Sequence, residues 1–270
     1  MTWFTFLSFI GNRLKGKRWD SFHSPYLFRL MSFMANDQGR FEKFAAIEAL
    51  RQKWLKNSTR IARHDKGTGS MYSGKPKTES ISAIAKHALS LPFQCRCMAR
   101  LVHLEKPNVI IELGSSLGIS AAYLQSGNPS SAITTVEGDP EIAKLAGTTF
   151  TELGMTGIQL VNSTFEEFLD SPEINDRQID LLFLDGNHHS KALLYYYEKL
   201  KTNFSANTIV LVDDIYWSRD MHQGWRKLID LPEVTQSVDC FRFGMLFFRK
   251  EFLEKENHRI RLPKKSLFNN

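Results

Sequence analysis

The sequence predicts an α/β fold in which a mostly parallel sheet carries helices on both faces, and three observations support this prediction. From residue 109 onward, short apolar runs without polar alternation recur, as expected of strands buried on both faces. Each of the first runs is followed by a segment with helical periodicity, which is the order of units that builds a parallel sheet. The length of 270 residues and the 42% hydrophobic content allow one full-sized core.

The predicted strand Val109–Leu113 is the element around which the other segments are organised. It stops at Gly114, Gly118 follows four residues later, and a helical pattern begins at Ile119. A strand, a glycine turn and a helix together offer backbone N–H groups and a helix N-terminus to a ligand, and glycine lets that ligand approach the backbone. A tight connection without a ligand has the same spacing, so the turn by itself does not decide between the two.

The next predicted strand, Ala132–Val136, ends in Glu137, about twenty positions beyond the glycines. A carboxylate at this place is suited to hold the two hydroxyl groups of a ribose. The pattern continues with predicted strands at Ile158–Val161, Ile179–Leu184 and Thr208–Val212, and with helices between them. Two further runs, Val234–Val238 and Phe241–Phe248, are joined by a very short connection, which predicts an antiparallel hairpin.

The residues Glu112-Leu113-Gly114-Ser115-Ser116-Leu117-Gly118, followed by Val136-Glu137-Gly138-Asp139, resemble motif I and its successor in class I S-adenosylmethionine-dependent methyltransferases. The Gly-x-x-x-Gly spacing differs from the Gly-x-Gly-x-x-Gly of dinucleotide dehydrogenases, which argues against NAD. The resemblance covers about Ser80 to Lys250. It implies a Rossmann-like seven-stranded sheet, with five parallel strands and a C-terminal antiparallel hairpin, and helices on both faces.

The resemblance also implies a site for S-adenosyl-L-methionine. Gly114 and Gly118 let the backbone approach the methionine part, the Ser120 hydroxyl lies near its carboxylate, and Glu137 accepts hydrogen bonds from the ribose. Thr164 and Phe165 match the position that meets adenine, although the Phe165 ring is equally explained as core. The full predicted cofactor set is Glu112, Gly114, Ser115, Gly118, Ser120, Glu137, Thr164, Phe165 and Asp185.

Acidic residues follow the predicted fourth and fifth strands, at Asp185, Asp213 and Asp214. Several acidic side chains at one edge of a sheet are energetically unfavourable unless cations or hydroxyl groups interact with them. The set resembles the metal site of cation-dependent O-methyltransferases of the catechol and caffeoyl-coenzyme A type, although Asp214 stands where that family commonly has Asn. Oxygen ligands suit Mg²⁺ or another divalent cation, which would lower the pKa of a substrate hydroxyl. In the alternative, one of the pair Asp213 and Asp214 caps the next turn and no metal binds.

His188 lies three residues after Asp185, where the same family places a catalytic lysine. Imidazole is an effective base at neutral pH, so His188 and Asp185 are the predicted catalytic residues. A packing or surface role for His188, with His189 as the functional residue, is the alternative. Tyr216, Trp217 and Trp225 lie where walls of a substrate pocket are expected, and core packing explains Trp225 as well.

The front of the chain is basic. Residues 1–107 hold 19 of the 35 Lys and Arg residues and 7 of the 29 Asp and Glu residues, a net charge of +12, so the remainder carries −6. We predict a helical, basic extension over residues 1–77 with a lid-like loop at Asp65–Tyr72, a methyltransferase domain over 78–250, and a charged, partly mobile tail over 251–270. Helices are expected at Ser21–Met34 and at about Phe41–Leu55.

Residues 1–20 are first apolar and then basic. An interfacial helix at a membrane, docking onto the body of the protein, and docking onto a second subunit in a homodimer all explain this order. The order is wrong for a secretory signal, and no apolar run approaches the length of a membrane span. The three cysteines, Cys95, Cys97 and Cys240, cannot form a disulfide framework, so we expect buried thiols in a reducing, cytoplasmic compartment.

These observations predict an S-adenosylmethionine-dependent methyltransferase, with a small-molecule hydroxyl as acceptor and a divalent cation, His188 or both assisting deprotonation. Methylation at nitrogen or of a macromolecule is a second hypothesis, which the basic front segment would serve. A non-catalytic protein of the same fold that binds nucleic acid or a membrane is a third. No recognition element accompanies the basic residues, which argues against nucleic acid.

Overall fold

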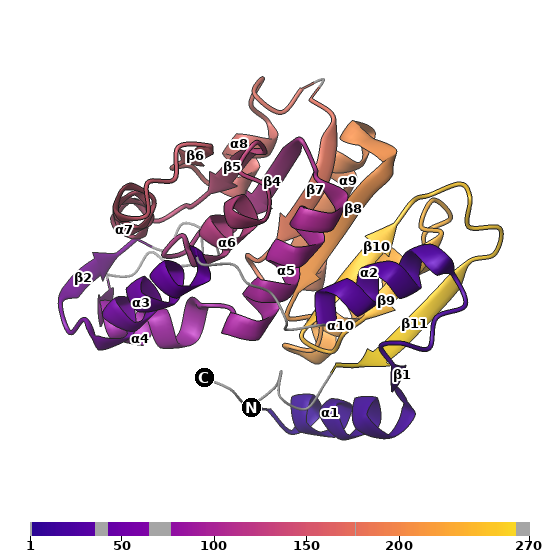
Figure 1. Ribbon diagram of the computed structural model, residues 1–270. Coiled ribbons are helices and arrows are strands. Elements are labelled where there is room, and N and C mark those ends of the chain that lie inside the picture. Colours follow the sequence, from indigo (N-terminus) through magenta and orange to yellow (C-terminus); the bar gives the residue numbers. More distant parts are fainter. Residues whose placement is uncertain (1, 36–42, 65–76, 176, 263–270) are drawn as a thin grey trace.

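The computed structural model describes residues 2–35, 43–64, 77–175 and 177–262, and a nine-stranded sheet forms its centre (Figure 1). Seven of the strands, in spatial order, are β6 (Ile158–Val161), β5 (Ala132–Val136), β4 (Val109–Leu113), β7 (Ile179–Leu184), β8 (Phe204–Asp213), β10 (Phe243–Phe247) and β9 (Gln236–Asp239). The five strands from β6 to β8 are parallel, and β10 is antiparallel to both β8 and β9. The predicted parallel sheet with a C-terminal hairpin is confirmed.

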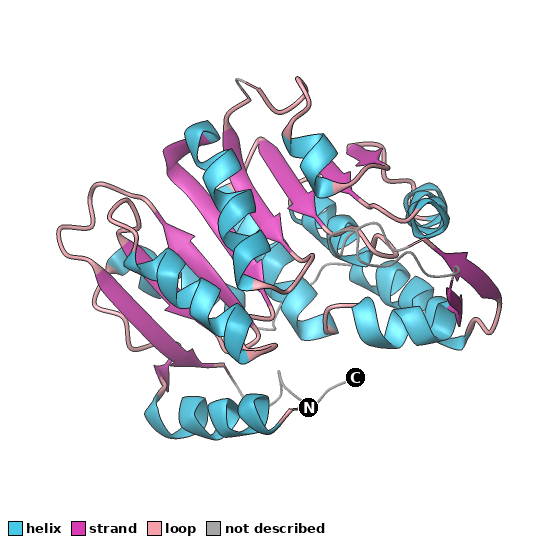
Figure 2. Ribbon diagram, turned by 180° about the vertical axis from the view of Figure 1, so that it is seen from behind, coloured by secondary structure: helices cyan, strands magenta, loops and turns pink. Residues whose placement is uncertain are grey.

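Helices cover both faces of this sheet, as Figure 2 shows from behind. One layer contains α2 (Pro25–Ala35), α3 (Lys43–Lys56), α4 (Ile81–Ala88), α5 (Pro92–Glu105), α6 (Ile119–Gly127) and α7 (Pro140–Glu152). The other contains α8 (Phe165–Leu169), α9 (Ser190–Leu200), a 3₁₀ turn at Lys201–Asn203 and α10 (Arg219–Asp230). Within each layer, neighbouring helices contact one another.

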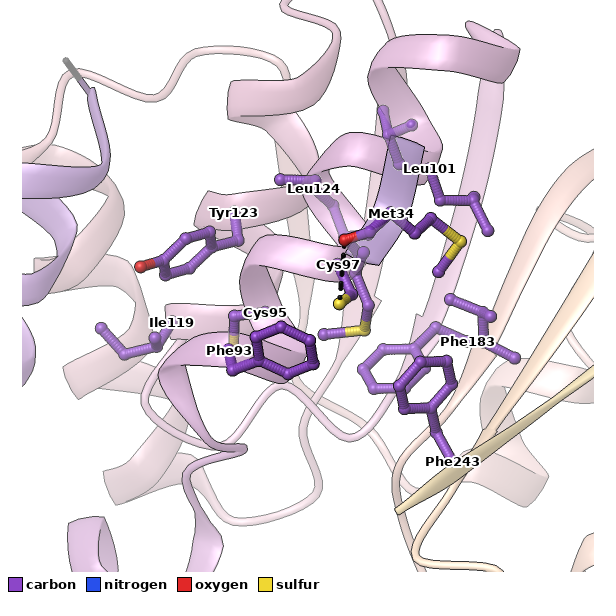
Figure 3. Close-up of a cluster of buried hydrophobic side chains, with 14 of the residues drawn as sticks. Met34, Phe93, Cys95, Cys97, Leu101, Ile119, Tyr123, Leu124, Phe183 and Phe243 are labelled. Carbon is purple, nitrogen blue, oxygen red and sulfur yellow. Dashed lines mark hydrogen bonds between the residues drawn. The ribbon is translucent and has the colours of Figure 1, made fainter. Parts of the chain in front are cut away.

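The strands supply side chains to two apolar cores, one under each helix layer. Leu181 and Phe183 of β7 point into the core with α5 and α6, whereas Leu182 and Leu184 point into the core with α9 and α10. Alternate residues on a strand face opposite sides, so a strand that is apolar at every position can fill both cores. Figure 3 shows the first core, in which Cys97 Sγ donates to the carbonyl of Met34 at 3.3 Å.

The sheet is wider than the sequence predicts, because two short strands extend its β9 edge. Strand β11 (Glu256–Arg261) pairs parallel to β9, and β1 (Lys17–Arg18) pairs parallel to β11. Within the predicted charged, partly mobile tail over residues 251–270, Glu256–Arg261 are therefore part of the sheet. Edge strands are exposed along much of their length, so β11 carries charged residues and has no apolar run to reveal it.

Helices α2 and α3 of the predicted extension form part of the main core. Leu27, Leu30 and Met31 of α2 are fully buried, and Trp54 of α3 is nearly so. The buried faces fall at helical spacing, which is why the sequence predicts both helices. The proposed lid, Asp65–Tyr72, lies outside the described residues; the strands on either side of this gap, β2 (Arg60–Arg63) and β3 (Lys77–Ser80), form a separate antiparallel ribbon.

Helix α1 (Trp3–Lys15) docks onto the body beside β11, as Figure 1 shows. The buried side chain of Asn12 donates from Nδ2 to the carbonyl of Ile260 at 3.2 Å, and the Phe9 ring meets Phe241 edge-on. Among the sequence-based explanations of residues 1–20, docking onto the body is confirmed.

The three cysteines are buried and free, as predicted. Within the described ranges, no helix is long and apolar enough to cross a membrane.

Candidate active site

The turn after β4 holds its two glycines in conformations that other residues rarely adopt. Gly114 has φ +112° and Gly118 has φ +78°. A Cβ on Gly114 would stand 2.4 Å from the carbonyl oxygen of Asp185, because β4 and β7 meet here and the Asp185 N–H donates to the Leu113 carbonyl at 2.9 Å. Glycine at 114 is therefore required by the approach of two strand ends as well as by φ.

Glu137 lies across this turn, as predicted. Its Oε2 accepts the Ser116 N–H at 2.9 Å and its Oε1 accepts the Asp139 N–H at 3.0 Å. Burial is the main cause that raises the pKa of Glu137, and the two backbone donors act in the opposite direction. Each oxygen keeps a second lone pair, so the carboxylate can still accept from a ribose hydroxyl.

Several buried oxygens at this edge lack a hydrogen-bond partner within the described part of the chain. They are the hydroxyl oxygens of Ser115 and Ser116 in the turn, the hydroxyl oxygen of Ser163 after β6, and Oε1 of Glu112. Buried polar atoms are normally satisfied by protein or water, so a group of them at the carboxyl edge of a parallel sheet fits a polar ligand. The residues present thus fit a cofactor with a ribose and an amino-acid portion.

Glu112 is fully buried at the end of β4, and its pKa is raised to about 7 by that burial. The Thr135 hydroxyl donates to its Oε2, and Ser120 also stabilises the charged form. The structure therefore brings the predicted site residues Ser120 and Glu112 together.

The two residues predicted to meet adenine have roles in the fold. Thr164 is the N-cap of α8, where its hydroxyl accepts the Glu167 N–H at 3.1 Å in a capping box. The ring of Phe165 is buried and packs over Gly186, since a Cβ on that glycine would stand 2.4 Å from the ring. The alternative of a core position for Phe165 is confirmed.

Asp185 and Asp213, at the ends of β7 and β8, are brought together as the sequence predicts. Burial and the charge of Asp213 raise the pKa of Asp185 well above its usual range. Burial, followed by the charge of Asp214, raises the pKa of Asp213 to about 7. Two neighbouring carboxyl groups cannot both ionise readily in a buried setting, so this pair holds a proton close to neutral pH.

Two residues that the sequence did not single out complete this pair. Gln94 of α5 donates from Nε2 to Oδ1 of Asp213, and the Ser90 hydroxyl reaches Oδ2 of Asp185 at 3.3 Å and Oδ2 of Asp213 at 3.5 Å. A nearly buried Gln inside an apolar helix is the one signal that could have indicated such a role.

The third predicted ligand, Asp214, is turned toward another partner. Its backbone has φ +47°, and its Oδ1 lies 3.9 Å from a guanidinium nitrogen of Arg242. In the described ranges, no three His, Cys, Asp or Glu side chains are arranged to hold a metal ion. An amide and a hydroxyl are already directed at Asp213 and Asp185, so these carboxyl groups have hydrogen-bond partners without a cation.

The ring of His188 lies 5.4 Å from that of Trp217, and the charge of Asp214 acts on it. Burial lowers its pKa, although the charge of Asp214 acts in the opposite direction, so the imidazole is neutral near pH 7. Trp217, the predicted wall residue beside His188, is 55% exposed.

The other two predicted wall residues belong to the core. Tyr216 is 5% exposed, and its hydroxyl donates to Oδ2 of Asp239 at 2.7 Å. Trp225 is 1% exposed, with its ring against Gly244 of β10. Both are apolar side chains of the α10 layer, which explains them without a substrate.

A glycine turn at the carboxyl edge of a seven-stranded core with this hairpin defines a Rossmann-like protein of the class I methyltransferase fold. Comparison with known proteins agrees. Residues 111–215 match the family model described as a methyltransferase domain. The matched segment contains the residues of motif I and its successor, in agreement with the resemblance drawn from these residues.

Solved structures share the fold at low sequence identity. A methyltransferase from Podospora anserina, solved with S-adenosylhomocysteine bound, aligns with a TM-score of 0.54 and 16% identity over 85% of this chain and 97% of that chain. An O-methyltransferase from Streptomyces achromogenes involved in tomaymycin synthesis, in complex with S-adenosylmethionine, aligns with a TM-score of 0.52 and 19% identity over 60% of this chain and 82% of that chain.

Among curated sequences, an uncharacterized protein from Sinorhizobium fredii is 29% identical over 171 residues. The match covers 57% of this chain and 18% of that relative, so the chain spans about a fifth of the length of this curated relative.

Proposed function

We propose that the protein transfers a methyl group from S-adenosylmethionine to a hydroxyl group of a small molecule. The observation that carries this proposal is that the glycine turn and the Asp185–Asp213 pair meet at one point, where Gly114 faces the Asp185 carbonyl. A cofactor held by the turn therefore lies next to groups that can accept a proton. The O-methyltransferase among the similar structures supports the choice of oxygen as the acceptor atom.

In this proposal, different residues of the chain bind the cofactor and remove the proton from the acceptor. When bound, S-adenosylmethionine supplies a methyl group on a positively charged sulfur. Gly114 and Gly118 admit it to the backbone, and Glu137 orients its ribose. Neutral His188 or the ionised form of the Asp185–Asp213 pair takes the proton from the acceptor hydroxyl at an imidazole nitrogen or a carboxylate oxygen.

A divalent cation is the second route to deprotonation. Three carboxylates at neighbouring strand ends favour it, because a cation would relieve their mutual repulsion. The hydrogen bond of Gln94 to Asp213 and the contact of Asp214 with Arg242 favour the route without a cation. Methylation at nitrogen uses the same cofactor site and differs in the acceptor that the pocket admits.

Isothermal titration calorimetry with S-adenosylmethionine tests the cofactor assignment. Glu137→Ala should weaken binding roughly tenfold to a hundredfold, because a hydrogen bond to a charged group contributes about 1.5–3 kcal/mol. Glu254→Ala, at an exposed glutamate, is the control and should bind like the wild type. Since Glu137 also accepts two backbone N–H groups, the folding of each variant is checked by thermal unfolding. Wild-type affinity in folded Glu137→Ala would remove this residue from the site.

A further inference from the structure

Helix α1 presents its apolar side chains to solvent. Five of them are substantially exposed: Trp3 at 71%, Phe6 at 43%, Leu7 at 48%, Ile10 at 39% and Leu14 at 77%. With 3.6 residues per turn, these positions fall within an arc of about 100° on the helix. They therefore form one continuous stripe, which we call the outer stripe of α1.

The opposite face of α1 is fixed to the protein by two polar side chains, Thr5 and Asn12, and by the rings of Phe4 and Phe9. The Thr5 hydroxyl donates to the Tyr216 carbonyl at 3.1 Å, and Asn12, which is 4% exposed, donates to the Ile260 carbonyl. A surface helix normally turns its apolar face inward and its polar face to water. In α1 two polar residues face the body while five apolar residues face solvent, so docking onto the body leaves the outer stripe uncovered by the described residues. An exposed apolar stripe of this kind marks an interaction surface.

The charge around the outer stripe indicates what binds there. Helix α1 contains no Asp or Glu, and its last turn carries Arg13 and Lys15. Lys17 and Arg18 follow directly and are exposed, although Arg18 forms an ion pair with Asp20 at 2.7 Å. An apolar stripe with lysines beside it is complementary to a surface of anionic lipid head groups.

A second copy of the chain fits this face less well. A two-fold contact through α1 would place the same patch of each copy opposite itself. The basic residues at the end of one α1 would then lie near the basic residues of the other and repel them. Neither helix has an acidic residue to neutralise these charges.

We propose that α1 binds peripherally to an anionic membrane surface, with the outer stripe in the boundary between head groups and acyl chains. At 1.5 Å per residue, its 13 residues measure roughly 20 Å, which suits a helix that lies in the interface. The hydrogen bonds of Thr5 and Asn12 hold the helix on the body, so binding does not require it to detach.

Co-sedimentation of the full chain with lipid vesicles tests this inference. We expect binding to vesicles of phosphatidylcholine and phosphatidylglycerol in equal parts, weaker binding to phosphatidylcholine alone, and weaker binding as salt rises. The double variant Trp3→Ser/Leu14→Ser should lower the partition coefficient about tenfold or more, because its two changes remove the most exposed apolar side chains of the stripe. Lys15→Ser/Lys17→Ser should lower it by about fivefold for each lysine on anionic vesicles.

Leu253→Ser is the matched control, because Leu253 is 95% exposed and lies outside α1. It should bind vesicles like the wild type. Failure of the wild type to bind anionic vesicles would overturn the inference, as would equal binding by Trp3→Ser/Leu14→Ser. Sedimentation equilibrium measures the oligomeric state. A dimeric wild type and a monomeric Trp3→Ser/Leu14→Ser variant would assign the outer stripe to an interface with a second copy, and not to a membrane. Each readout is independent of methyl transfer.

Discussion

At the scale of single residues, the proposed function assigns the removal of the acceptor's proton to His188 and the Asp185–Asp213 pair. If the pair and His188 act without a cation, a chelator should leave the rate nearly unchanged, and His188→Ala should lower it about 10² to 10⁴-fold. His189→Ala, one position further along, is the control and should have little effect. The measurement is the transfer rate across a panel of hydroxyl compounds with EDTA and with added Mg²⁺. Loss of activity in EDTA with recovery in Mg²⁺ would assign the step to a cation.

The same pair makes the free energy of unfolding depend on pH. The pKa of Asp213 is about 7 in the folded protein and near 3.9 in an unfolded chain, so between these values the folded state binds more protons. Stability should therefore fall as pH rises from about 4 to 7, by at most about 1.4 kcal/mol per pH unit for one group.

Asp213→Asn removes this titration, so the variant should lose less stability than the wild type between pH 5 and pH 7. Urea unfolding at several pH values measures the difference, and Asp230→Asn, at an exposed position, is the control. Parallel pH profiles for the wild type and Asp213→Asn would contradict the raised pKa.

A site residue could be predicted when the residues that define its role lie close to it in the sequence. Gly114, Gly118 and Glu137 follow strand ends at fixed spacing, so local pattern was enough. The roles of Ser90 and Gln94 depend on which side of α5 meets Asp213, and this is set by packing between residues more than a hundred positions apart.

At the scale of elements, α3 is linked to the cofactor turn through α7. Trp54 of α3 donates from Nε1 to the Thr149 hydroxyl at 3.0 Å, and this hydroxyl donates to the Leu117 carbonyl at 2.6 Å. Trp54→Phe removes the first bond and should cost about 1–2 kcal/mol of stability with little change in cofactor affinity. Thr149→Val removes both and should also weaken cofactor binding, since Leu117 lies in the turn. Urea unfolding measures the stability of the two variants, and calorimetry measures their affinity for the cofactor. Identical effects of the two variants on cofactor affinity would contradict the proposed link.

Elements buried in the sheet were predictable, and elements at its edge were not. Strand β4 is buried at four of its five positions and reads as an apolar run, whereas one of the six positions of β11 is buried. On one side β11 pairs with β1 at only two of its residues, and most of its side chains lie outside the core, so it has no pattern to distinguish it from a charged tail.

At the scale of the whole molecule, the predicted extension is part of the body rather than an appendage. Its helices supply Leu30, Met31 and Ile47 to the main core, and Lys53 pairs with Glu152 of α7 at 2.6 Å. A chain that begins at residue 77 should therefore expose the α5 side of that core and fail to fold cooperatively. Circular dichroism during thermal unfolding checks this. A truncated protein that unfolds cooperatively and binds S-adenosylmethionine would show an independent methyltransferase domain.

The pairing of β1 with β11 has a consequence for the order of events during synthesis. Thr5 and its partner Tyr216 are 211 positions apart, and Asn12 and its partner Ile260 are 248 positions apart, so the docking surface of α1 is incomplete until the residues of β11 have been made. At about 5–20 residues per second, that interval lasts on the order of tens of seconds. During this interval both faces of the apolar helix α1 are exposed on the nascent chain. A chaperone that binds nascent chains, or a lipid surface, can therefore contact α1 before the body of the protein does.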